Sequence, residues 1–204
     1  MIAGPCAGQT PAQQNAAHHE PPAQRYATVG MFVAGGALGL AAHEGGHLLL
    51  DVLFDADPGL RRVEFHGVPF FAITHRSGLP PAQEFAVSAA GFWVQQAGSE
   101  WLLTRRPNLR GERAPLAKGF LAFHVLASAS YAGAALLRTG PSERDTLGMA
   151  GASGVDERWI APVVLAPALF DTWRYYRPGS RRAVWLARAA KIGGVLLAVR
   201  AAAR

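Results

Sequence analysis

The chain alternates between long apolar segments and polar connections. Residues 26–54 carry only two charged side chains, Glu44 and Asp51, and residues 85–103 and 119–137 form two further apolar segments. A shorter segment, residues 159–173, contains two prolines and the carboxylate of Asp171. A membrane-spanning helix needs about 20 predominantly apolar residues. The pattern therefore predicts four spans.

The connection after the first apolar segment has a different pattern. A turn at Asp57-Pro58-Gly59 is followed by two short stretches rich in β-branched and aromatic residues, 62–66 and 70–75, around Gly67 and Pro69. This arrangement predicts a β-hairpin. The expected fold is mainly α, a polytopic membrane helix bundle of about four spans with a small β-hairpin loop after the first span.

The two ends of the chain differ from this central part. Residues 1–25 mix Pro, Gln, Ala and Gly without apolar periodicity, so we expect a disordered tail. Residues 26–176 form the expected membrane-embedded core. Residues 177–204 place several arginines near one helical face, which favours a basic amphipathic helix on the membrane surface over a fifth span.

Composition and charge support a membrane setting. Hydrophobic residues make up 50% of the chain and charged residues only 17%, below the usual quarter. The net charge is +6, and all of the 20 basic residues except Lys118 and Lys191 are arginine. These arginines flank the apolar segments, so anionic lipid headgroups explain them better than nucleic acid does. The distribution of Lys and Arg over alternate loops predicts that both termini are cytoplasmic.

The first apolar segment contains the pentapeptide His43-Glu44-Gly45-Gly46-His47. On a helix two residues that are four apart lie about one turn apart on the same face, so both imidazoles can bind one metal ion. This H-E-x-x-H spacing is typical of zinc sites, in which the glutamate acts as a general base. A structural interpretation is also open, in which two buried histidines form hydrogen bonds with their neighbours and with Glu44.

A third metal ligand has to come from elsewhere in the chain. The lone Cys6 cannot build a cysteine zinc site. Three residues are candidates. Asp51 lies one turn beyond His47, too far along a straight helix to share the ion; His124 has no second polar group beside it; and Asp171 is a carboxylate in an apolar segment, where a cation would offset its desolvation. Asp171 is therefore the preferred candidate.

These motifs together resemble the site-2 protease family of intramembrane zinc metalloproteases. The resemblance rests on the pentapeptide in the first span, the small-residue run Ser88-Ala89-Ala90-Gly91 in the second, and Leu169-Phe170-Asp171-Thr172 in a late span with prolines. It covers about residues 27–175. The family has Leu-Asp-Gly where this chain has Phe170-Asp171-Thr172, and its Gly-Pro and Asn of the middle span have only partial counterparts in Gly91 and Gln95.

The resemblance implies Zn²⁺ held by His43, His47 and Asp171, with Glu44 as the catalytic base. The expected function is zinc-dependent intramembrane endopeptidase activity on membrane-anchored proteins, in the bacterial cytoplasmic membrane. An exposed strand of the hairpin could hold an extended substrate peptide. Two alternatives stay open: a non-catalytic membrane protein that binds metal, and a peripheral zinc hydrolase whose apolar segments are core helices.

Overall fold

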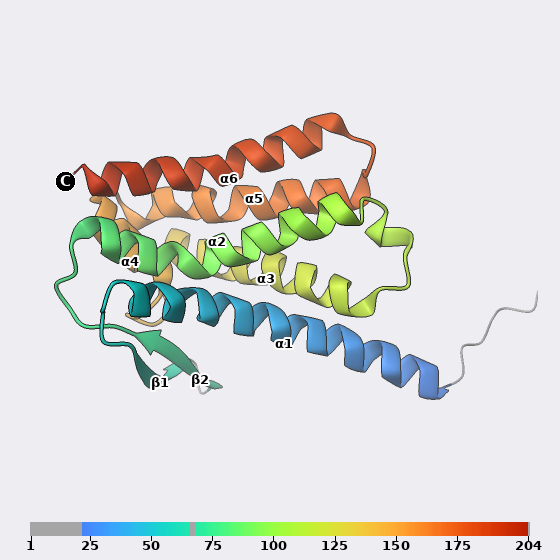
Figure 1. The fold of residues 1–204 in the computed structure, drawn as a ribbon, viewed down its shortest axis with the longest axis horizontal. Helices are drawn as coiled ribbons and strands as arrows, with labels where there is room; N and C mark the ends of the chain where they lie inside the picture. Colours follow the sequence, from blue (N-terminus) through green and yellow to red (C-terminus); the bar gives the residue numbers. More distant parts are fainter. Residues whose placement is uncertain (1–21, 66–67, 204) are drawn as a thin grey trace, which may run out of the picture.

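The computed structural model describes residues 22–65 and 68–203 and is mainly helical (Figure 1). Most of the predicted tail, residues 1–21, lies outside the described residues. The elements in chain order are α1 (Pro22–Leu53), β1 (Gly59–Phe65), β2 (Val68–Thr74), α2 (Pro81–Arg105), a 3-10 turn (Leu109–Gly111), α3 (Pro115–Leu137), α4 (Asp145–Ser153), α5 (Glu157–Tyr176) and α6 (Arg181–Ala202). Each of the four predicted apolar segments is helical.

The long helices run side by side, and successive ones point in opposite directions (Figure 1). Helix α1 packs against α2 and α3, and α5 packs against α3 and α6. The hairpin and α4 lie at one end of the bundle, which we call the hairpin end. The α2–α3 and α5–α6 connections lie at the other end. We call it the arginine-rich end because it carries Arg105, Arg106, Arg110, Arg113, Arg177, Arg181 and Arg182.

Two described helices, α1 and α3, are long and apolar enough to cross a membrane. The other long helices average a lower hydropathy because they carry polar side chains, many of which face inward. Gln95 and Ser99 of α2 and Asp171 of α5 are fully buried, while Trp101 and Leu169 on the same helices are more than half exposed. Gln96, the neighbour of Gln95, is also buried. The bundle therefore has polar groups inside and large apolar side chains outside.

The predicted hairpin is confirmed. Strands β1 and β2 pair antiparallel, with Gly59 opposite Thr74 and Phe65 opposite Val68. The hairpin packs at the carboxyl end of α1, and β2 is the strand in contact with that helix. This contact brings β2 close to the pentapeptide motif.

Two features of the carboxyl-terminal half differ from expectation. Prolines inside a helix usually break or kink it, but α5 continues across Pro162 and Pro167 to Tyr176, with α3 and α6 packed along it. Helix α6 does not lie apart from the bundle but runs back along α5 and α2. It therefore ends at the hairpin end, opposite the start of α1, although we expected both ends of the chain on one side (Figure 1).

Small residues allow α1 to pack very closely against α3. A Cβ atom on Gly119 would collide with the carbonyl oxygen of Phe32, and one on Gly35 would collide with that of Leu116. Because these neighbours are backbone atoms, they cannot move aside as a side-chain end could. The two glycines thus fix the distance between the motif helix and α3.

We therefore expect Gly119→Ala to lower the free energy of unfolding in detergent by about 1–3 kcal/mol, the usual cost of overpacking. The matched control is Gly133→Ala on the same helix, where a Cβ atom meets nothing within 4 Å. Removing a helix-interior glycine there should stabilise by up to about 1 kcal/mol. Equal stability of the two variants in denaturant titrations would contradict the close contact.

Candidate metal centre

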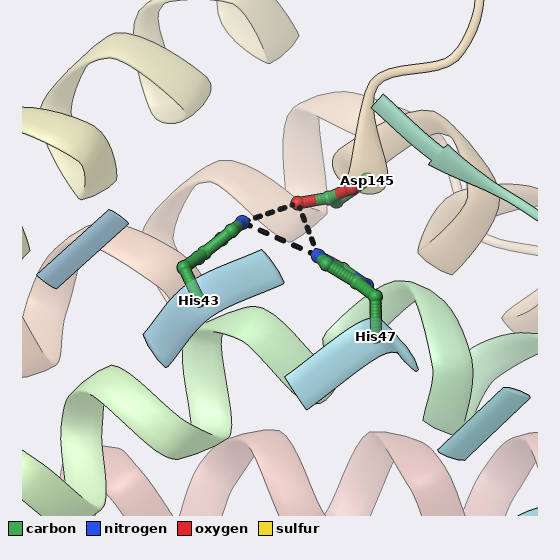
Figure 2. Close-up of side chains that lie close together, drawn as sticks. All are labelled: His43, His47 and Asp145. Carbon is green, nitrogen blue, oxygen red and sulfur yellow. Dashed lines mark hydrogen bonds and ion pairs between the residues drawn. The ribbon is translucent and has the colours of Figure 1, made fainter. Parts of the chain in front are cut away.

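Helix α1 brings the two motif histidines together. His43 and His47 are both buried, and their Nε2 atoms lie 3.3 Å apart. Both side chains point away from α1 toward the start of α4 (Figure 2). The one-turn spacing that the sequence predicted for a shared ligand site is therefore present.

The other nitrogen of each ring is held by a hydrogen bond. The Nδ1 of His47 lies 2.8 Å from the carbonyl oxygen of Val87, which can only accept, so this nitrogen must carry the proton. The Nδ1 of His43 lies 3.2 Å from Oε1 of Gln95, and the Gln95 amide donates in turn to the Ser128 hydroxyl. These partners fix both rings in the tautomer that leaves Nε2 free to bind a metal.

Asp145 completes the group as its third member. Its Oδ2 atom lies 3.1 Å from Nε2 of His43 and 3.4 Å from Nε2 of His47 (Figure 2). The three residues offer ligand atoms within 4.8 Å of one another. Asp145 is the first residue of α4, so this candidate ligand comes from the start of a short helix and not from one of the long helices.

The geometry of these three atoms suits a cation. Two imidazole nitrogens without protons and a carboxylate oxygen all present lone pairs, which repel one another unless a cation or proton lies between them. Ligands bound tetrahedrally at 2.0–2.1 Å from zinc are separated by about 3.3–3.4 Å. The separations of 3.1, 3.3 and 3.4 Å are close to that value. The residues therefore fit a metal ion of the size of zinc.

The chain around Asp145 is firmly held. Arg144 donates two hydrogen bonds to the Glu157 carboxylate, at 2.7 and 2.6 Å, and the Thr146 hydroxyl donates to the same group at 2.7 Å. Both neighbours of the ligand are thus tied to the start of α5. Burial alone would raise the pKa of the Asp145 carboxyl, but the His47 and His43 imidazoles, when they carry a proton on Nε2, hold it well below its usual range. Asp145 is therefore negatively charged at neutral pH.

Glu44 lies beside the histidines at the wall of a cavity of about 310 Å³. The cavity is also lined by His47 and Asp145, by Ala72 and Ile73 of β2, and by Ser130, Tyr131 and Ala134 of α3. Glu44 is half-buried. A molecule in this cavity can therefore reach the ligand group, the Glu44 carboxylate and the edge of β2 at the same time.

The structure does not bring Asp171 to the histidines. Its carboxylate accepts hydrogen bonds from the Ser99 hydroxyl at 2.6 Å, from Lys191 at 3.0 Å and from Arg174 at 3.2 Å. Basic side chains thus balance the charge that we expected a metal ion to balance. Asp145, and not the predicted Asp171, lies with the two motif histidines.

The other two candidates also lie away from the ligand group. His124 is fully buried beside Asp171, with 3.5 Å between its Nε2 and Oδ2 of the carboxylate. Asp51 is fully buried one turn below His47, and His75 is its nearest basic neighbour, at 3.7 Å. The sequence alone does not single out Asp145, because this residue stands among other charged residues in a polar loop. The one indication is that the predicted spans place this loop at the same end of the bundle as the hairpin that follows the motif helix.

Comparisons with known proteins do not identify a relative. No protein-family model matches the chain, and neither a curated protein nor a solved structure does. The resemblance to the site-2 proteases thus stays a prediction from a few motifs.

The ligand set can be tested by zinc affinity. We expect His43→Ala, His47→Ala and Asp145→Ala each to weaken zinc binding by more than the 10- to 100-fold that loss of an outer partner costs, roughly. Asp171→Asn should leave zinc affinity unchanged because its partners are Ser99, Lys191 and Arg174. Competition with a chelating dye measures each affinity. Loss of zinc in Asp171→Asn but not in Asp145→Ala would restore the original assignment.

Gly91 provides a second test because it makes room for the His43 ring. A Cβ atom there would lie 2.5 Å from Nε2 of that ring. Gly91→Ala should therefore displace the imidazole and weaken zinc binding by about 10- to 100-fold, as for loss of an outer partner. The control is Gly45→Ala, where a Cβ atom meets nothing within 4 Å. An unchanged affinity in Gly91→Ala would show that the ring adapts.

Proposed function

We propose that the protein is a membrane-embedded zinc endopeptidase that hydrolyses peptide bonds of membrane-anchored proteins. The observation that carries this proposal is the convergence of His43, His47 and Asp145 beside Glu44 at one cavity. Two imidazoles and a carboxylate leave a fourth tetrahedral position for water, as in catalytic zinc sites. A structural zinc site would have its four positions filled by protein.

Zinc is the metal we propose because its ligand preferences match this donor set. When bound, the ion supplies a Lewis acid that lets water lose a proton near neutral pH and that polarises a carbonyl group. His43, His47 and Asp145 would hold it. The Gln95 amide and the Val87 carbonyl keep the two rings in the metal-binding tautomer.

Glu44 is proposed as the general base. Its carboxylate takes a proton from the attacking water as the new C–O bond forms at the substrate carbonyl. It then gives this proton to the amide nitrogen as the C–N bond breaks, so the products are a carboxylate and an amine. Its place beside a ligand histidine, at the cavity wall, suits both transfers.

The β2 strand is proposed to hold the substrate. Among the described residues β2 pairs only with β1, so no strand covers its other edge. Ala72 and Ile73 of β2 line the cavity that contains Glu44. A peptide extended along this edge would pass the ligand group with its backbone hydrogen-bonded, which is a common way to hold peptides.

The outer surface of the bundle supports the proposed membrane setting. Large apolar side chains are exposed along α1 and α6, among them Val33, Leu49 and Leu196, all above 60% exposure. Large exposed apolar patches are rare on a soluble monomer. We propose that α1, α2, α3 and α5 span the bilayer, with α6 running back along α5. Loops on the cytoplasmic side carry more Lys and Arg, so the arginine-rich end is assigned to the cytoplasm.

The resemblance to the site-2 proteases is kept as part of this proposal. The motif helix packs against the small-residue run of α2. Gly46 lies against the Ala90 carbonyl group, and Gly91 lies against the His43 ring. An aspartate joins the two histidines, although it comes from the start of α4. The bacterial cytoplasmic membrane is the location that this resemblance favours.

The test is Glu44→Gln, which keeps the shape of the side chain but removes its basicity. We expect bound zinc to stay stoichiometric while cleavage of a membrane-anchored reporter falls by about 10²- to 10⁴-fold, the usual value of general-base catalysis. Cleavage is measured in carbonate-washed membranes with wild type as control. Cleavage at the wild-type rate in Glu44→Gln would mean that Glu44 is not the base of this reaction. Release of the activity by carbonate would instead indicate a peripheral hydrolase.

A further inference from the structure

A second hollow of the molecule lies between α2 and α6, away from the metal centre. It has a volume of about 680 Å³ and is lined on α2 by Ala97, Trp101 and Arg105, which follow one another at intervals of four residues. Arg188 and Ile192 line it from α6. We call it the α2–α6 groove. Because α2 ends and α6 begins at the same end of the bundle, the groove starts at the arginine-rich end (Figure 1).

Polarity changes along the groove. Arg105 is the last residue of α2, and Trp101 and Ala97 lie one and two turns deeper. On the antiparallel α6, Arg188 lies nearer the same end than Ile192 does. The groove is thus cationic where it opens at the end of the bundle, and further along Ala97, Trp101 and Ile192 give it apolar surface beside the ion pair of Glu100 and Lys191. Trp101 is 64% exposed, in the position of an aromatic side chain at a membrane interface.

The charges beside the groove do not balance. Glu100 accepts hydrogen bonds from Arg188 and Lys191, both at 2.9 Å, and from Arg174. Lys191 and Arg174 also contact Asp171. These three basic residues outnumber the two carboxylates by one. Arg105 has no carboxylate partner among the described residues, which adds a second uncompensated positive charge.

Arg188 keeps donors available for a ligand. Its contact with Glu100 uses Nε, and its two terminal nitrogens form no hydrogen bond with another described residue. A guanidinium group offers five N–H donors in a planar fork that matches phosphate. Arg105 on the facing helix supplies a second such fork. Two arginines at the mouth of an apolar groove therefore form a cationic clamp for a phosphate group.

We propose that the α2–α6 groove binds an anionic phospholipid. Its phosphate lies between Arg105 and Arg188, and one acyl chain follows Ala97, Trp101 and Ile192. Basic pockets between helices at the cytoplasmic side are suited to anionic headgroups. The apolar continuation of the groove favours a lipid over a free phosphate ion. This inference requires the proposed membrane insertion but does not depend on proteolysis.

The experiment titrates detergent-solubilised protein with dioctanoyl phosphatidylglycerol, dioctanoyl phosphatidylcholine and inorganic phosphate, with calorimetry as the readout. We expect saturable binding of the phosphatidylglycerol only. Arg105→Gln/Arg188→Gln should weaken it by about tenfold or more, since charge-assisted hydrogen bonds are among the strong ones. Ala97→Phe, which fills the apolar part without a change in charge, should also weaken it.

The matched control is Arg177→Gln/Arg182→Gln, which removes two exposed positive charges from the same end but outside the groove. It should bind like wild type. Stoichiometric zinc and an unchanged helical spectrum show that each variant is folded, whether or not the protein cleaves peptides. If the arginine pair in the groove does not fold, Ala97→Phe alone decides the question, because Ala97 is exposed and uncharged.

Three results would overturn the proposal. Equal weakening in the control pair would mean that surface charge attracts the lipid without a defined site. Equal binding of phosphatidylcholine would mean that the groove does not recognise the anion. Equal binding of inorganic phosphate, unaffected by Ala97→Phe, would mean that the groove is a site for a free anion and not for a lipid.

Discussion

The candidate metal centre depends on how closely α1 can approach its neighbours. Gly46 and Gly91 let α1 and α2 meet at the level of the motif, and Gly35 and Gly119 do the same for α1 and α3 further along. At this separation the ring of His43 reaches Gln95, and the ring of His47 reaches the Val87 carbonyl. A wider gap would leave the Nδ1 atoms of both rings without these partners, and the two Nε2 atoms would no longer be directed at Asp145.

Much of the fold could be predicted because it follows from local patterns. Apolar segments gave the helices, and turn residues around two β-rich stretches gave the hairpin. The positions of His43, Glu44 and His47 relative to one another follow from helix geometry alone. The small-residue run at Ser88–Gly91 of α2 lies against the motif helix, a contact that such small side chains allow.

The third member of the ligand group could not be found in this way because it depends on a distant contact. Asp145 is one of several charged residues in its loop, and its position is set by the bonds of Arg144 and Thr146 to Glu157. Asp171 drew attention because it stands alone in an apolar segment. Its basic partner Lys191 is 20 residues away, on a helix that we expected to lie at the membrane surface. Because α6 was expected at the membrane surface, Lys191 could not be recognised as the partner of Asp171.

The position of α6 has a consequence for how the bundle is assembled. Among the described residues of α1 to α5, the carboxylates of Glu100 and Asp171 share Arg174, and His124 lies beside Asp171. A buried charge without a partner is costly among apolar helices. Arg188 and Lys191 contact these carboxylates only when α6 docks. A bundle of α1 to α5 alone would hold the two acidic groups with fewer cations than the complete chain provides, so these groups favour the docking of α6.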